Sequence, residues 1–179
     1  SDLTVEGFDE FIGRAQKVAQ TVARTSAEVT QATADFARMG YTVRESLALA
    51  EQALILVNVG DGIENVDQAT QSIISTLKGF QMEATEASHI VDGLNEVANN
   101  FAVTTSDLAD GVQRAGSTLA QSGTTYEETL GLLTATNEVL QKMEKSSTGL
   151  ITISQRIRGV SEAFEDGEAP VNFTAKLGE

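Results

Sequence analysis

The sequence predicts an all-α protein, built as an array or bundle of antiparallel helical hairpins with about seven helices and no sheet. Apolar residues recur at steps of three and four, which places them on one face of a helix, and no segment alternates as a strand would. Gly40, Gly79 and Gly123 each end such a segment, at intervals of 39 and 44 residues. A period of roughly 40 residues is typical of stacked helix pairs. Only 5% of the residues are aromatic, so the core should consist of Ala, Leu, Val and Ile between closely packed helices.

Residues 1–38 are predicted to form one long N-terminal helix. Between Phe8 and Arg38 the apolar residues follow a near-heptad pattern, and after Gly13 this segment contains neither glycine nor proline. Its apolar stripe is narrow and rich in alanine, which suits coiled-coil-like packing.

Residues 39–164 are predicted to form the helical-hairpin core, which begins with a turn at Gly40. Glycine adopts the left-handed backbone conformation that follows a helix at little steric cost. Thr42 and Glu45 then have the T-x-x-E spacing of a capping box, so the next helix should start there. Residues 58–62, NVGDG, are the strongest turn signal in the chain and should end this helix.

Two more helices are predicted before residue 101. The first runs from Ile63 to Lys78 and ends at Gly79. The second covers residues 84–100 and places Phe101 on its inward face.

Residues 101–143 predict one complete hairpin. Gly123 separates its two helices, and Thr125 and Glu128 repeat the capping-box spacing at the start of the second. Leu140 and Met143 complete the apolar face of that second helix.

The last predicted helix covers about residues 149–164. Its apolar stripe consists of Leu150, Ile153, Ile157, Val160 and Phe164. Residues 165–179, which contain the only proline, are predicted to form an irregular C-terminal tail.

No combination of residues in the sequence predicts a reaction centre, so we expect the protein not to be an enzyme and to use no cofactor or metal. The only histidine, His89, lies on a predicted helix without a nucleophile spaced to meet it. The acidic pairs Asp61/Glu64 and Asp107/Asp110 lack the spacing of a calcium loop and suit helix N-termini better. The residues to which we assign a role are therefore structural turn residues, namely Gly40, Thr42, Glu45, Gly79, Gly123, Thr125 and Glu128.

The charge of the chain excludes several classes of partner. Twelve basic and 26 acidic residues give a formal net charge of −14, which repels nucleic acid phosphates and anionic lipid. The longest strongly apolar run, residues 53–57, is far shorter than the ~20 residues of a membrane helix. Self-association remains possible.

The turn sequences resemble those of phage tail tape measure proteins, in particular their TP901-type core region. That region has Ala/Ser/Thr/Gln-rich helices interrupted by Gly-ϕ-[ST]-ϕ-x-E turns. The corresponding strings here are MGYTVRES at 39–46, KGFQME at 78–83 and SGTTYEET at 122–129, with FAVTTSDL at 101–108 and GVQRAG at 111–116 between them. Residues 148–158 are similar to the closing helix with its basic residues. Gln81 departs from the pattern, because the family has a capping threonine there.

The resemblance implies a structural protein of the tail lumen that templates assembly of the tail tube, sets tail length and leaves ahead of the DNA. Its implied partners are the tail tube protein and tail assembly chaperones, and its implied locations are the virion tail lumen and, during assembly, the host cytoplasm. The alternative is a non-enzymatic helical interaction scaffold or a coiled-coil signalling domain of a bacterial protein. Such a signalling domain would keep an unbroken heptad pattern over longer runs, whereas glycines interrupt this chain at short intervals.

Overall fold

The computed structural model describes the backbone of residues 5–165 and the side chains of residues 9–159. Within that range the chain is helical and contains no strand, which confirms the all-α prediction. The described part has eight α-helices rather than about seven, and one short 3₁₀ helix, η1. Their bounds are α1 Val5–Thr21, α2 Ser26–Arg38, α3 Val43–Val59, α4 Val66–Phe80, η1 Ala84–Glu86, α5 Ala87–Asn100, α6 Thr105–Ala120, α7 Tyr126–Leu140 and α8 Met143–Glu165.

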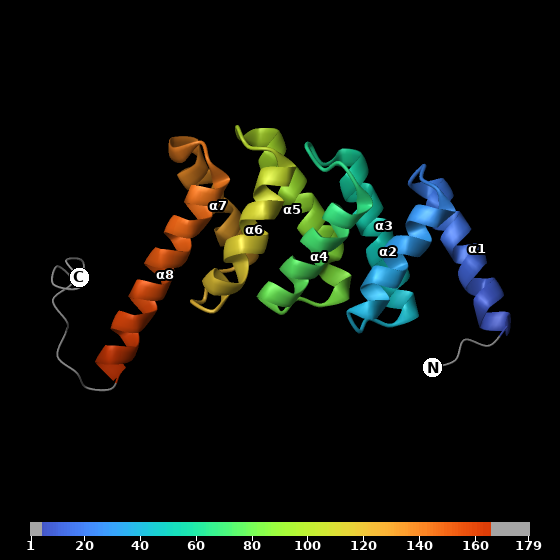
Figure 1. Ribbon diagram of the computed structural model, residues 1–179, viewed down its shortest axis with the longest axis horizontal. Coiled ribbons are helices and arrows are strands. Elements are labelled where there is room, and N and C mark those ends of the chain that lie inside the picture. Colours follow the sequence, from blue (N-terminus) through green and yellow to red (C-terminus); the bar gives the residue numbers. More distant parts are fainter. Residues whose placement is uncertain (1–4, 166–179) are drawn as a thin grey trace.

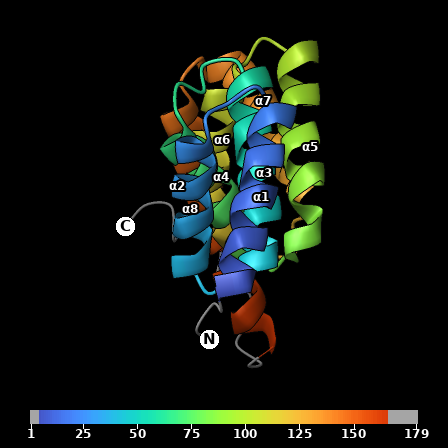
Figure 2. The ribbon, with the colours of Figure 1, turned by 90° about the vertical axis from the view of Figure 1, so that its right-hand side faces the viewer.

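The helices stand side by side in a row, and successive connections lie alternately at the two long edges of that row (Figure 1). All substantial contacts between described α-helices join helices that are consecutive or next but one in the chain. The even-numbered helices α2, α4, α6 and α8 therefore form one layer, and the odd-numbered helices form a second layer, as the end view shows (Figure 2).

The prediction of one long N-terminal helix is wrong, because the chain turns between α1 and α2. Ala23 adopts the left-handed conformation with φ 52°, and the Arg24 amide donates to the carbonyl oxygen of Ala19 (2.9 Å). Thr25 and Glu28 then form a capping box that starts α2. The break escaped the sequence analysis because no glycine marks it, although the T-x-x-E spacing was present at residues 25–28.

The turn predicted at Gly79 lies two residues further on. Gly79 is inside α4, and the left-handed residue after that helix is Gln81, with φ 55°. A β-carbon at Gly79 would lie 3.5 Å from the backbone nitrogen of Ser117 in α6. Gly79 thus lies at the contact between α4 and α6, and it does not end the helix.

The boundary between the last two helices also differs from the prediction. The α7 helix ends at Leu140, Gln141 is left-handed with φ 49°, and α8 begins at Met143 rather than near residue 149. Met143 is buried as part of α8, whereas Leu140 is half exposed. Phe101, predicted to face inward, is 49% exposed and follows the C-terminus of α5. The predicted tail, residues 165–179, starts at the last residue of α8 and otherwise lies outside the described residues.

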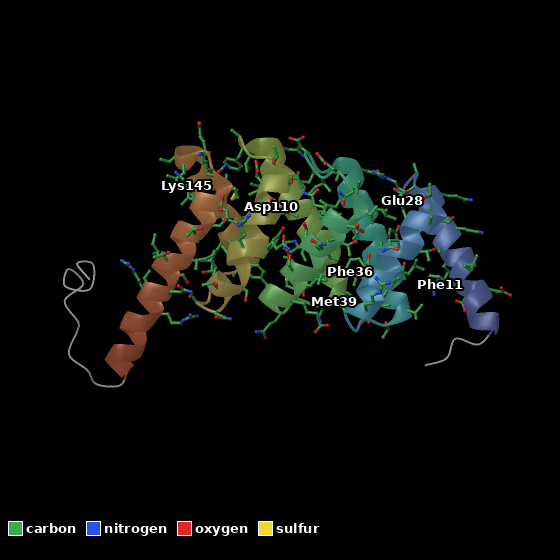
Figure 3. All side chains as sticks on the ribbon, in the orientation of Figure 1. Phe11, Glu28, Phe36, Met39, Asp110 and Lys145 are labelled. Atoms are coloured by element: carbon green, nitrogen blue, oxygen red, sulfur yellow. The ribbon has the colours of Figure 1, made fainter. Side chains whose placement is uncertain are left out.

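The core runs along the whole row between the two layers. Fully buried members include Phe36, Leu49, Ile73, Leu94 and Leu108. Figure 3 shows Phe36 on α2 inside the row and Met39 at its edge, which agrees with their exposure.

The buried polar residues among the described side chains are all serine or threonine. Thr33, Thr76 and Ser147 are buried, and each donates to the carbonyl oxygen four residues earlier at 2.7–2.8 Å. Because these three hydroxyl groups form hydrogen bonds within their own helix, they need no polar partner on the neighbouring helix. Their small size allows helix backbones to approach closely.

Replacing Gln141 with glycine should raise the free energy of unfolding by roughly 0.5–1 kcal/mol, because a β-carbon in the left-handed conformation costs about 1–2 kcal/mol and glycine avoids most of that cost. The matched control is Gln121→Gly after α6, where φ is −62° and glycine should destabilise. Urea unfolding measures both. Equal shifts in the two variants would contradict the left-handed conformation at Gln141.

Candidate functional site

The predicted capping residues form reciprocal hydrogen bonds at the starts of α3 and α7. The Thr42 amide donates to the Glu45 carboxylate (2.8 Å), and the Glu45 amide donates to the Thr42 hydroxyl oxygen (3.3 Å). At α7 the corresponding distances between Thr125 and Glu128 are 2.9 and 3.2 Å. Each pair satisfies two backbone amides that the helix leaves without a partner.

Gly40 and Gly123 lie in the left-handed conformation immediately before these caps, with φ 95° and 85°. A β-carbon at either glycine would meet no atom within 4 Å. The requirement for glycine there is therefore conformational and does not come from crowding. Of the predicted turn residues, the structure places Gly40, Thr42 and Glu45 together in one turn and Gly123, Thr125 and Glu128 together in another, whereas Gly79 belongs to neither.

Two further helix starts share one of these bonds, not predicted from the sequence, in which a glutamate carboxylate accepts from the backbone amide three residues earlier. At α2, the Thr25 amide donates to the Glu28 carboxylate at 2.9 Å. At η1, the Glu83 amide donates to the Glu86 carboxylate at 2.7 Å. The T-x-x-E spacing at 25–28 was a usable signal for the first of them.

Two of these caps, at the starts of α2 and α3, lower the pKa of their carboxyl group. The pKa of Glu28 is lowered from 4.5 mainly by the hydrogen bond from the Thr25 amide, with help from the Thr25 hydroxyl and Arg24. The pKa of Glu45 is lowered mainly by the hydrogen bond from the Thr42 hydroxyl and then by the Thr42 amide. A lowered folded-state pKa means that the carboxylate stabilises the fold above pH 4.5, and that this stability is lost as the pH falls through the lowered value.

The double variant Glu28→Gln/Glu45→Gln should therefore lose less stability on acidification below about pH 4.5 than the unmodified chain does. Glutamine still fits a capping box but does not titrate. Urea unfolding from pH 6 to pH 3 measures the slope. The control Glu96→Gln removes an exposed carboxylate outside any cap, and a slope change as large as that of the double variant would contradict the prediction.

His89 lies at a contact between α5 and α7. Its Nε2 atom is within hydrogen-bond distance of the Glu127 carboxylate, and both side chains are exposed. The His89 hydrogen bond is the main cause of the lowered pKa of Glu127. Among the described residues, the only hydrogen bond of the His89 ring is the one with Glu127, so the pair resembles a surface contact between helices.

Tyr126 joins the same two helices from the inside. Its hydroxyl group donates to the Ile90 carbonyl oxygen (2.8 Å), and burial raises the pKa of Tyr126 well above its usual range. Its ring packs edge-on against Phe80, with a centroid distance of 5.8 Å. A β-carbon at Gly93 would lie 3.0 Å from the ring, so Gly93 leaves the space that Tyr126 occupies.

The described residues include no group of three His, Cys, Asp or Glu side chains that could hold a metal ion. Asp107 lies in the first turn of α6, where its amide donates to the Thr104 hydroxyl oxygen (3.0 Å). Asp61 lies in the loop before α4, and its carbonyl oxygen accepts from the Ser106 amide (3.0 Å). A membrane-crossing length of apolar helix is absent between residues 5 and 165.

The described part of the chain defines a class by its fold, namely an all-α protein built as a row of helices with capped turns (Figure 1). The chain matches the family model described as phage-related minor tail protein over residues 13–176. It therefore belongs to the phage-related minor tail protein family, which gives it a structural role in the phage tail. No solved structure matches the chain.

Proposed function

We propose that this chain is a section of the tape measure protein of a phage or prophage tail, which templates assembly of the tail tube and sets tail length. Family membership supports the tail role. The turn strings at residues 39–46, 78–83 and 122–129 resemble those of tape measure proteins and support the narrower assignment.

The observation that carries the proposal is the regular spacing of the helices in one layer. The helices α2, α4, α6 and α8 begin at Ser26, Val66, Thr105 and Met143, at steps of 40, 39 and 38 residues. We infer from these steps a repeat of antiparallel helix pairs, each of which adds one similar unit along the row. If each helix pair adds an equal distance along the row, the length of the row is proportional to the number of residues, as the function of a ruler requires.

The proposed partners are the tail tube protein, which would surround the chain in the tail lumen, and assembly chaperones, which would hold it in the host cytoplasm. A net charge of −14 repels the genome that follows it in the tube. Ejection ahead of the DNA is part of the same proposal.

The test is to insert four extra copies of residues 105–142, one helix pair each, after Lys142 in the parent protein and to measure tail length by electron microscopy. Packed helices lie about 8–10 Å apart, so four closed pairs should lengthen the tail by about 40 Å. Four pairs opened into a continuous helix would instead add about 230 Å at ~1.5 Å per residue. We expect the smaller increase.

The matched control inserts a scrambled sequence of the same length and composition, which removes the helical periodicity. It should not reproduce the 40 Å step. An increase near 230 Å would show that assembly opens the pairs, and an unchanged tail would place this section outside the ruler.

A further inference from the structure

The helices α2, α4, α6 and α8 have a stripe of residues at equivalent positions. Neighbouring helices cover this stripe on α2, α4 and α6, whereas on α8 it is exposed. When the even helices are aligned by their starts, equivalent positions are Ala32 and Phe36 in α2, Ser72, Thr76 and Phe80 in α4, Gly111, Ala115 and Leu119 in α6, and Gly149, Ile153 and Ile157 in α8. The stripe is largely or wholly buried on α2, α4 and α6. On α8, Ile153 is 57% and Ile157 is 60% exposed.

The burial patterns of α6 and α8 agree closely. Along the 16 residues of α6, every buried position corresponds to a buried position of α8 except those of this stripe. The three exceptions are spaced by four residues, so they form one ridge on the helix surface. The α8 helix thus keeps the pattern of an interior helix but lacks the neighbour that would cover this ridge.

Gly111 on α6 and Gly149 on α8 occupy the first position of the ridge, and only Gly111 has a neighbouring side chain over it. A β-carbon at Gly111 would lie 2.6 Å from the sulfur of Met143 and 3.1 Å from Leu133 Cδ1. Gly111 is therefore the point where the next helix pair presses a long unbranched side chain against the α6 backbone. At Gly149 a β-carbon would meet nothing within 4 Å, although the same small residue is present.

We propose that the outer face of α8 is a docking surface for one further amphipathic helix pair of the kind formed by α7 and α8. The partner would place a long apolar side chain over Gly149, as Met143 does over Gly111, and cover Ile153 and Ile157. This inference rests on the burial pattern and is independent of the tape measure function.

The charged residues beside the ridge indicate which charges the partner should carry. Lys145 lies one turn before Gly149, near the N-terminal end of α8 (Figure 3), and Arg156 adjoins Ile157; both are exposed. One acidic residue, the exposed Glu144, lines the same surface as Lys145, Gly149 and Ile153. Acidic side chains on the docking helices would complement the two basic residues.

A second copy of this chain fits the surface poorly. Two α8 faces packed together would bring Lys145 and Arg156 of both copies into one interface, an excess of positive charge that the single Glu144 of each copy does not balance. The other end of the row does not supply the required side chains either, because Ser26, Thr30 and Ala37 occupy the positions of Met143, Ser147 and Ser154 and are exposed.

The experiment duplicates residues 121–158 in tandem after Arg158 in the full chain, which adds one helix pair in register. The chain has no cysteine, so Ile157→Cys in the first copy provides a single thiol on the ridge. We expect its reaction with a disulfide reagent to slow at least tenfold in the duplicated chain relative to the unduplicated chain. A thiol at Gln16→Cys on α1 should react equally in both.

Gly149→Leu in the first copy is the blocking variant. It should leave the urea midpoint of the unduplicated chain unchanged or higher, because its β-carbon meets open space, and it should restore thiol reactivity in the duplicated chain. If the duplicated chain is not helical by circular dichroism, residues 82–120 serve as a second in-register insert with the same expected protection.

Three results would overturn the proposal. One is a thiol that stays equally reactive with both inserts. Another is a thiol already protected in the unduplicated chain at every concentration, which would mean that another part of the same chain covers the ridge. The third is protection that appears with concentration together with a dimer mass by light scattering, which would identify a second copy as the occupant.

Discussion

Replacing Tyr126 with alanine should lower the free energy of unfolding by about 3–5 kcal/mol, the largest effect that we expect of any single substitution outside the aliphatic core. The ring is fully buried, packs edge-on against Phe80 and fills the space beside Gly93. Its removal leaves a cavity where α4, α5 and α7 meet. Urea unfolding followed by circular dichroism measures the loss.

The control Tyr126→Phe separates packing from hydrogen bonding. It keeps the ring and removes only the hydroxyl group that donates to Ile90, so it should cost about 0.5–1.5 kcal/mol. If the alanine and phenylalanine variants lost equal stability, the hydrogen bond rather than the ring packing would dominate at this position.

Replacing Gly111 with leucine should destabilise the fold by about 1–3 kcal/mol, the usual cost of overpacking. In an exposed helix the same change stabilises by up to about 1 kcal/mol, because glycine is a poor helix former. The opposite sign is expected here because the added side chain must displace Met143 and Leu133.

Gly149→Leu is the matched control, since Gly149 occupies the equivalent position on α8 without a neighbour. It should leave the midpoint of urea unfolding unchanged or raise it. A loss of stability in Gly149→Leu as large as in Gly111→Leu would mean that the two glycines do not occupy equivalent positions.

The sequence was sufficient for the helical class and for the starts of α3 and α7, because both depend on local chemistry. The 3.6-residue period of apolar side chains reports which face is buried, and a T-x-x-E string such as Thr42 to Glu45 contains all the atoms of its own cap. Helix ends were harder to predict. Ala23, Gln81 and Gln141 take the left-handed conformation that sequence reasoning reserves for glycine.

Tertiary packing explains the errors at glycines and at exposed apolar residues. Gly79 allows a close approach between α4 and α6, and a glycine used for packing has the same letter as one used for a turn. Ile153 and Ile157 continue a helical stripe, so their pattern indicated burial, but whether a stripe is buried depends on whether a neighbour covers it. The tail role followed from resemblance and family membership, because capped turns and helix faces carry no reactive group that identifies them.

The restriction of contacts to neighbouring helices has a mechanical consequence. A force applied to the two ends of the row acts on the helix pairs in series, because the substantial contacts within the described residues join helices that are consecutive or next but one. One pair of about 38–40 residues can therefore be pulled out while the others stay folded, with a gain of about 130 Å of extended chain. Stretched in an optical trap, the protein should lengthen in separate steps, each the extended length of one helix pair.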